Sequence, residues 1–188
     1  MGKDYQEFIT TSYYEREFNT NAVKILPGQY SATTDGTAII TLLGSCVSVC
    51  LYDEERGVGG MNHFMLPTAQ EKPDGGGCTD PYGPPCANPC SARYGKCALK
   101  RLLERLESLG ARRDKLKAKL FGAGRVMAGG ADIGSKNGAF ALQYLKTRGI
   151  PVIASDMGDR YPRKLIFFPA TGRAFVKRLD NEPEGTVK

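Results

Sequence analysis

The order of elements expected along this chain predicts a single α+β domain in which helices cover the faces of mixed β-sheets. Three observations support this fold class. The chain has 188 residues, a length that suits one domain with a substantial core. Hydrophobic residues make up 41% of it and charged residues 24%, as in ordinary globular proteins. Strand-like segments come first, followed by a helix, a strand, a second helix and three strands, and this order predicts helices packed on sheets.

The two ends of the chain are expected to lie outside the folded domain. Residues 1–21 are polar with scattered aromatic side chains, so we expect an N-terminal extension that docks loosely or is partly disordered. The domain is expected over residues 22–179. It begins with a short strand over Ala22–Ile25 and Gly28–Ser31 that has a Pro-Gly turn within it. Residues 180–188 are expected to form a flexible tail.

Composition and charge argue against several classes of protein. No run of about eighteen apolar residues occurs, and the N-terminus lacks the apolar core of a signal peptide. The sequence therefore predicts a cytoplasmic protein without membrane insertion. The net charge of +6 and the pI of about 9.0 would suit nucleic acid, an anionic membrane or an acidic protein partner. Because the cations are spread along the chain and no nucleic-acid motif is present, we expect no nucleic acid.

The stretch 41–67 is the centre of the predicted site. The preceding run Ala38–Leu43 is apolar and β-branched, which predicts a buried strand that reaches into this stretch, and a Gly-Ser pair then breaks it into a turn. The next segment, Val47–Leu51, is either a second strand or the first turn of a helix, because its short apolar pattern fits both. After a turn rich in charge and glycine, Met61–Leu66 is expected to be a strand. Segments joined by tight loops tend to lie side by side.

Two residues of this stretch form a candidate nucleophile and base. Cys46 follows the Gly-Ser turn, and His63, the only histidine of the chain, lies in the returning strand. A thiol becomes an effective nucleophile as the thiolate, and a neighbouring imidazole is the usual base that produces it. Backbone N–H groups at the turn, around Gly44 and Ser45, could hold a bound carbonyl oxygen. Two simpler interpretations remain open, a cysteine that is only a small core residue and a histidine that is only structural.

The following residues, 68–93, form a loop rich in proline, glycine and cysteine, where packed helix or strand is disfavoured. Four cysteines lie in it or just after it: Cys78, Cys86, Cys90 and Cys97. Their spacing lacks the paired Cys-x2-Cys arrangement of common zinc sites, and disulfides do not persist in a reducing cytoplasm. We therefore expect free thiols, with zinc as the alternative. Because the loop follows the segment of His63, we also consider it a candidate lid or partner-contact loop.

The second half of the chain predicts two helices and several strands. Leucines recur at steps of three and four between Gly95 and Leu109, which predicts a core-facing helix that Gly110 ends. A second helix is expected over Ser135–Arg148, with Ser135 or Asp132 as its cap. The expected strands are Leu116–Phe121, Pro151–Ser155, and a hairpin of Lys164–Phe168 with Arg173–Lys177. The glycines that begin at Gly122 fit neither the dinucleotide nor the Walker pattern, so nucleotide binding is disfavoured.

Two long blocks of this sequence resemble the CheD family of chemoreceptor glutamine deamidases. The first is LLGSCVSVCLYD followed by GGMNHFMLP, and the second runs from FGAGRVMAGGADIGSKNGAF to FFPATGRAFVKRL. Together they cover most of the chain from about Tyr30 to Leu179. The resemblance implies layered mixed β-sheets flanked by helices. It also implies a Cys-His-Thr hydrolase that converts receptor glutamines to glutamate and releases ammonia, with no metal or organic cofactor.

The resemblance assigns the site residues one by one. Cys46 matches the nucleophile and His63 the general base of the family. Thr41 matches the third member, which would orient His63, although some members of the family place this threonine one residue further from the cysteine, where this chain has Ile40. The turn at Gly44 and Ser45 would support the oxyanion. The glycines from Gly122 onward would line the surroundings of the site.

The resemblance also implies partners. The cytoplasmic helices of a chemoreceptor would be the substrate, and a CheC-type phosphatase is a further expected partner. Two alternatives follow: the protein could act mainly as a regulatory binding partner of such a phosphatase, or it could hydrolyse receptor glutamate methyl esters through the same acyl-enzyme.

Overall fold

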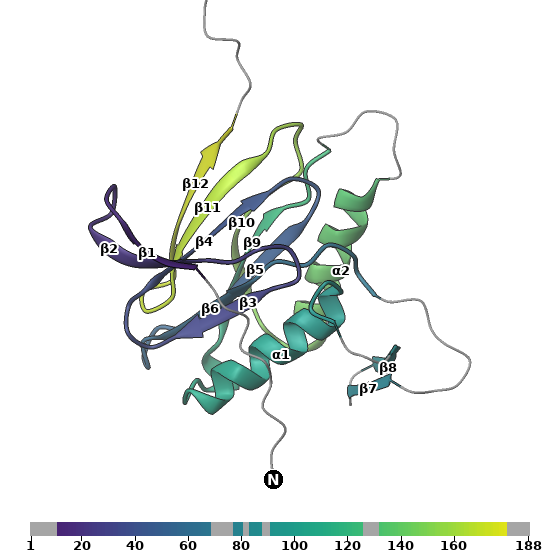
Figure 1. Ribbon diagram of the computed structural model, residues 1–188. Helices are drawn as coiled ribbons and strands as arrows, with labels where there is room; N and C mark the ends of the chain where they lie inside the picture. Colours follow the sequence, from purple (N-terminus) through teal and green to yellow (C-terminus); the bar gives the residue numbers. More distant parts are fainter. Residues whose placement is uncertain (1–10, 69–76, 81–82, 88–90, 126–131, 180–188) are drawn as a thin grey trace, which may run out of the picture.

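The computed structural model describes residues 11–68, 77–80, 83–87, 91–125 and 132–179, and for the two short ranges 77–80 and 83–87 it describes the backbone alone. Within these ranges the chain forms two five-stranded sheets, a separate hairpin, two α-helices and a short 3-10 helix at Arg113–Lys115. The two sheets lie on top of each other, and both helices lie on the outer side of one of them (Figure 1). This arrangement confirms the predicted α+β class of layered mixed sheets flanked by helices.

The first sheet has the strand order β1-β2-β4-β11-β12. Its strands are β1 (Thr11–Glu15), β2 (Thr20–Lys24), β4 (Ala38–Leu43), β11 (Arg163–Phe168) and β12 (Arg173–Arg178). Only the β2–β4 pair is parallel, so the sheet is mixed. We call it sheet A.

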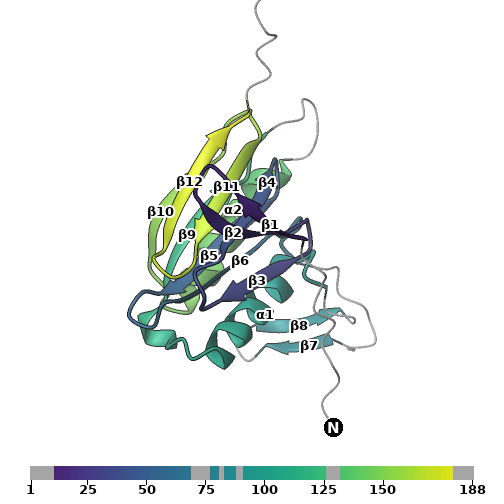
Figure 2. The same cartoon turned by 60° about the vertical axis from the view of Figure 1, so that its left-hand side comes forward.

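The second sheet, sheet B, has the order β10-β9-β5-β6-β3. Its strands are β3 (Tyr30–Thr33), β5 (Val47–Asp53), β6 (Val58–Asn62), β9 (Lys117–Gly122) and β10 (Val152–Met157). β10 is parallel to β9, and the remaining pairs are antiparallel. Turning the molecule shows the hairpin of β7 (Gly77–Asp80) and β8 (Gly83–Ala87) near α1, away from sheet A (Figure 2).

Three hydrophobic clusters hold the layers together. The largest lies between sheet B and the helices α1 (Gly95–Ser108) and α2 (Ile133–Thr147), and it includes the leucines predicted to form the buried face of α1. A second cluster fills the space between the two sheets, and a third covers the outer face of sheet A. Because β5 lies between the first two clusters, all seven of its residues are buried.

Most elements expected in the second half of the chain are confirmed within two residues. Both helices and the strands β9, β10, β11 and β12 lie where the patterns predicted them. The cap of α2, which the sequence left open, is Asp132, whose carboxylate accepts the Ser135 N–H at 3.0 Å. The 47–51 segment, also left open, is a strand. Gly110 follows α1 with φ of +94°, a left-handed conformation that glycine adopts freely.

The structure also differs from the sequence expectations. The short strand expected over 22–31 is instead two strands, β2 and β3, that belong to different sheets. Residues 11–21, assigned to the extension, contain β1 and the start of β2, while residues 1–10 and 180–188 lie outside the described ranges. The loop 68–93 contains the hairpin β7–β8, where strands were disfavoured. Cys97 is disulfide-bonded, so the expected free thiol is wrong for this residue.

A buried arginine links the two sheets at one end. Arg163, the first residue of β11, is fully buried, and its guanidinium donates to the backbone carbonyl of Asp156 at 2.6 Å. It also donates to the Asp156 carboxylate and to the carbonyl of Gly158. Since Asp156 belongs to β10 of sheet B, these bonds hold the end of β10 against sheet A.

We expect the Asp156→Ala variant to lose about 2 kcal/mol of unfolding free energy, because it leaves the buried guanidinium of Arg163 without a carboxylate partner. Urea denaturation measures the loss. The matched control is Glu104→Ala, which breaks only the exposed Lys100–Glu104 pair on α1 and should cost under about 0.5 kcal/mol. Equal losses in the two variants would contradict a structural role for the buried pair.

Candidate active site

Cys46 lies where the chain crosses from one sheet to the other. β4 ends at Leu43 in sheet A, and after the three-residue turn 44–46 the chain enters β5 of sheet B. Cys46 is partly buried and packs against the hydrophobic cluster between the sheets. The crossing therefore holds the thiol at the end of the space between the two sheets, where it stays partly accessible.

His63 follows the last residue of β6 and is held through its backbone. Its N–H donates to the carbonyl of Gln29 at 2.9 Å, and its carbonyl accepts the N–H of Gly28 at 2.7 Å. The next residue, Phe64, exchanges two hydrogen bonds with Val47, at 3.0 and 3.1 Å. The strand expected over 61–66 is thus divided into the end of β6 and two isolated bridges, at Phe64 and at Leu66.

This bridge places the cysteine and the histidine on the same face. Val47 and Phe64 both point into the cluster beneath the helices. Because side chains alternate along extended chains, their neighbours Cys46 and His63 face the other way, into the space between the sheets. The expected juxtaposition of these two segments is therefore present in the structure.

Thr41 completes the arrangement from sheet A. Its hydroxyl oxygen lies 2.8 Å from Nδ1 of His63 and 2.9 Å from the carbonyl oxygen of Ile25. Along β4 the side chains alternate, so Thr41 faces sheet B with Ile39 and Leu43. Ile40, the alternative position for the third residue, packs in the cluster on the opposite face of sheet A. Thr41 is thus the residue in contact with His63.

These two contacts determine which nitrogen of His63 carries the proton. A carbonyl oxygen can only accept a hydrogen bond, so the single hydroxyl proton of Thr41 goes to Ile25. The hydroxyl oxygen then accepts from His63, which requires a proton on Nδ1. Nε2 is left unprotonated, and it is buried without a hydrogen-bond partner among the described residues. Such a nitrogen is able to accept a proton from a thiol.

Burial makes both partners neutral near pH 7. It lowers the pKa of His63 to about 4, because the charged imidazolium is disfavoured away from water. Burial also raises the pKa of the Cys46 thiol above its ordinary value. The resting pair is therefore a thiol and a neutral imidazole.

The turn 44–46 has N–H groups without a partner among the described residues. Its carbonyl groups, by contrast, all accept hydrogen bonds from neighbouring segments. The carbonyl of Gly44 accepts the N–H of Gly124 at 2.8 Å, and that of Cys46 accepts the N–H of Ala123 at 2.8 Å. The Ser45 carbonyl accepts the side-chain amide of Asn137 at 3.2 Å. The N–H groups of Ser45 and Cys46 donate to nothing within the described part of the chain. They are available to an oxyanion.

Two glycines allow this close packing. Gly122 ends β9 with φ of +106°, and a Cβ at this position would lie 2.2 Å from the carbonyl oxygen of Cys46. A Cβ at Gly134, in the first turn of α2, would lie 2.4 Å from the carbonyl oxygen of Ala123. The glycines expected to surround the site therefore include Gly122 and Gly124, which contact the turn directly. Sequence reasoning missed Asn137 and Gly134, which no motif identified.

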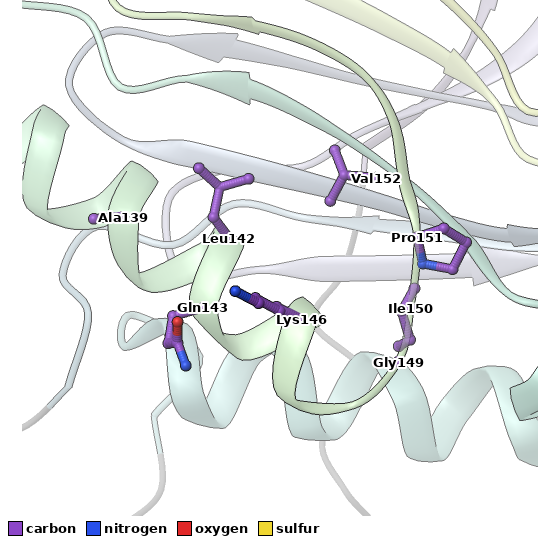
Figure 3. A pocket seen from close by; sticks show the side chains of 8 residues that line it. All are labelled: Ala139, Leu142, Gln143, Lys146, Gly149, Ile150, Pro151 and Val152. Atoms are coloured by element: carbon purple, nitrogen blue, oxygen red, sulfur yellow. The ribbon is translucent and has the colours of Figure 1, made fainter.

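A cavity of the structure lies apart from the candidate active site. A pocket of about 490 Å³ is lined by the last turns of α2 and by the connection into β10, and it contains neither Cys46 nor His63 (Figure 3). Over the described ranges, no group of three or more potential metal ligands occurs. No helix in the described chain is long and apolar enough to cross a bilayer. The cysteines at 78, 86 and 90 have no described side chains, so the zinc alternative stays a prediction.

Comparison with known proteins identifies relatives along nearly the whole chain. A family model described as "CheD chemotactic sensory transduction" matches residues 81–178. A probable chemoreceptor glutamine deamidase CheD of Methylobacillus flagellatus is 44% identical over 97% of this chain and 86% of its own. A similar protein of Dechloromonas aromatica is 44% identical over 100% and 88%, and one of Shewanella oneidensis is 46% identical over 93% and 81%.

We expect nuclear magnetic resonance of the single imidazole to show the Nδ1–H tautomer and a pKa of about 4. Because His63 is the only histidine, its nitrogen signals need no assignment. The chemical shifts of the two ring nitrogens, followed from pH 8 to pH 4 on folded protein, measure both properties. A titration near 6.5, or a proton on Nε2, would show that the burial or the hydrogen bond is incorrect.

The Thr41→Val variant supplies a second test of the tautomer. Valine keeps the shape of threonine but offers no acceptor to Nδ1–H, so we expect the Nε2–H tautomer to become populated. The same nitrogen signals report the change. The control is Thr20→Val, which alters a threonine on β2 whose hydroxyl donates to the carbonyl of the next residue, and it should leave the imidazole signals unchanged.

Proposed function

The chain belongs to the CheD family, and on this premise we propose that it is a chemoreceptor glutamine deamidase. It hydrolyses the side-chain amide of receptor glutamines to glutamate and releases ammonia, which makes it an amidohydrolase with a cysteine nucleophile. The observation that supports these catalytic roles is the hydrogen bond from His63 to Thr41, at 2.8 Å. It leaves Nε2 of His63 unprotonated on the face shared with Cys46. Thr41, Cys46 and His63 are the catalytic residues of this proposal.

In the first half of the reaction an acyl-enzyme forms. Nε2 of His63 takes the proton of the Cys46 thiol while the sulfur attacks the carboxamide carbon of the glutamine. The carbonyl oxygen becomes an oxyanion, which the free N–H groups of Ser45 and Cys46 bind. When the carbon–nitrogen bond breaks, the imidazolium returns its proton to the leaving nitrogen. Ammonia departs, and a thioester between Cys46 and the substrate remains.

In the second half water replaces the sulfur. Nε2 of His63 removes a proton from the water, whose oxygen attacks the thioester carbon, and the same N–H groups bind the second oxyanion. The carbon–sulfur bond then breaks, the thiol regains its proton, and glutamate is released. Water is consumed and ammonia is produced, and no step requires a metal or an organic cofactor.

Thr41 acts on His63 through orientation. Its hydroxyl is fixed by the Ile25 carbonyl, so its lone pair keeps Nδ1–H in place and directs Nε2 toward the thiol. It fills the place of the third group that carboxylates or amides occupy in other hydrolases. A neutral hydroxyl gives little stabilisation to a charged imidazolium, in keeping with the pKa of about 4. Proton transfer therefore accompanies the attack of sulfur on the substrate.

The substrate and the setting follow from the family. We propose that the protein acts in the cytoplasm on the helices of a chemoreceptor, whose acidic surface would suit a chain of net charge +6. A CheC-type phosphatase stays a proposed partner. A purely regulatory role would leave Cys46 unnecessary, and methyl ester hydrolysis would use the same thioester with methanol as the leaving group.

We expect Cys46→Ala and His63→Ala to lower deamidation by at least about 1,000-fold, because each removes a group needed to form the acyl-enzyme. Mass spectrometry of a receptor cytoplasmic fragment measures the conversion of each glutamine. The matched control is Cys50→Ala, which removes a buried thiol of β5 that the mechanism does not use. Full activity of Cys46→Ala would refute the thiol mechanism, and no activity of folded wild-type protein would favour a binding role.

The pH profile is a separate prediction. The base must be neutral, and a His63 pKa of about 4 keeps it neutral throughout the range above pH 5. A histidine with the ordinary pKa of 6.5 would be roughly 3% neutral at pH 5. We therefore expect kcat/KM on a receptor fragment to retain most of its pH 7 value at pH 5, with circular dichroism as a check on folding. A steep loss between pH 7 and pH 6 would argue against the buried, neutral imidazole.

A further inference from the structure

Asn137 of α2 joins the two halves of the site through one side chain. It is fully buried, and its amide nitrogen donates to the carbonyl of Ser45 at 3.2 Å and to that of Met65 at 2.8 Å. Ser45 directly precedes Cys46, and Met65 is two residues after His63. A single NH2 group thus bonds to the nucleophile turn and to the segment of the base.

We infer that Asn137 is a positioning residue that fixes the separation of Cys46 from His63. Both hydrogens of its NH2 group are used, one for each segment, so the two carbonyls cannot move apart without losing a bond. The bond to Ser45 also turns that carbonyl toward α2, which leaves the N–H groups of the turn for the oxyanion. This inference rests on the proposed deamidase function and adds a residue to it.

The local structure gives no other reason for an asparagine here. The cap of α2 is Asp132, and position 137 lies inside the helix, where asparagine is a poor helix former. The carbonyl oxygen of its side chain is buried with no partner in the described part of the chain, which is unfavourable for folding. A leucine of similar size would avoid this loss. What only asparagine supplies is the pair of donors directed at Ser45 and Met65.

The helix that carries Asn137 is itself firmly placed against the site. The backbone of Gly134 packs on the carbonyl of Ala123, and Ala123 in turn donates its N–H to the Cys46 carbonyl. One turn later, Gly138 packs against the Ala123 side chain and Met157. These contacts place α2 directly against the surface that holds the turn, and they set the position of Asn137 relative to it. A residue on a rigid element is suited to holding a catalytic geometry.

The test compares Asn137→Ala and Asn137→Leu with wild-type protein. We expect kcat for deamidation of a receptor fragment to fall about 100-fold in both variants with KM within about 2-fold of wild type, because displacement of the catalytic groups by about 1 Å has this effect. Released from α2, the turn should also expose the thiol, so alkylation of Cys46 by iodoacetamide, measured by peptide mass spectrometry, should become several-fold faster. Because leucine fills the space that alanine would leave empty, Asn137→Leu can be measured even if Asn137→Ala fails to fold.

The matched control is Leu145→Ala on the same helix. Leu145 is fully buried in the cluster beneath the helices and lies about two turns further along α2 than Asn137, so we expect its loss to lower the temperature of unfolding without altering the turn. Below that temperature we expect wild-type kcat and wild-type alkylation. An unchanged kcat in the Asn137 variants, or an equal fall in Leu145→Ala, would overturn the inference. Wild-type protein without deamidation would instead refute the proposed function, and alkylation of Cys46 would still test the contact.

Discussion

The hydrogen bond between Thr41 and His63 is the contact on which the site depends. It joins sheet A to the segment that follows β6 at 2.8 Å, inside a space lined mainly by apolar side chains. In such surroundings a hydrogen bond must be fully satisfied or it destabilises the fold, and the Ile25 carbonyl satisfies the hydroxyl proton. The same bond that makes burial of His63 tolerable also determines its tautomer. One pair of side chains therefore both satisfies the buried imidazole and sets which of its nitrogens is protonated.

The crossing between the sheets explains why Cys46, the proposed nucleophile, lies where it does. A chain that leaves β4 and enters β5 must turn at the end of the space between the layers, and Cys46 is the last residue of that turn. Gly124, Asn137 and Ala123 donate to the carbonyls of this turn, and its N–H groups at Ser45 and Cys46 have no partner within the described residues. The proposed oxyanion site would thus be a consequence of how β9 and α2 pack on the crossing. It needs no side chain of its own.

Much of the site was predictable because its signals are local. A Gly-Ser turn after an apolar run indicates the end of a strand, and a single histidine a short distance further along indicates a base within reach of Cys46. The two helices and the C-terminal strands were equally clear, since leucine spacing and alternation report which face is buried. The first strands were harder to predict. β2 and β3 are close in sequence yet belong to different sheets, and apolar patterns do not say which sheet a strand joins.

The sequence by itself determined the α+β class and the family resemblance and proposed the cysteine–histidine pair, because these depend on residue types and short spacings. Only the tertiary structure shows which of positions 40 and 41 contacts His63, since this depends on which face of β4 meets sheet B. It also decided the protonated nitrogen of His63, which requires knowing that Ile25 accepts the Thr41 hydroxyl. Asn137 lies far along the chain from Cys46, and long-range packing alone brings the two together.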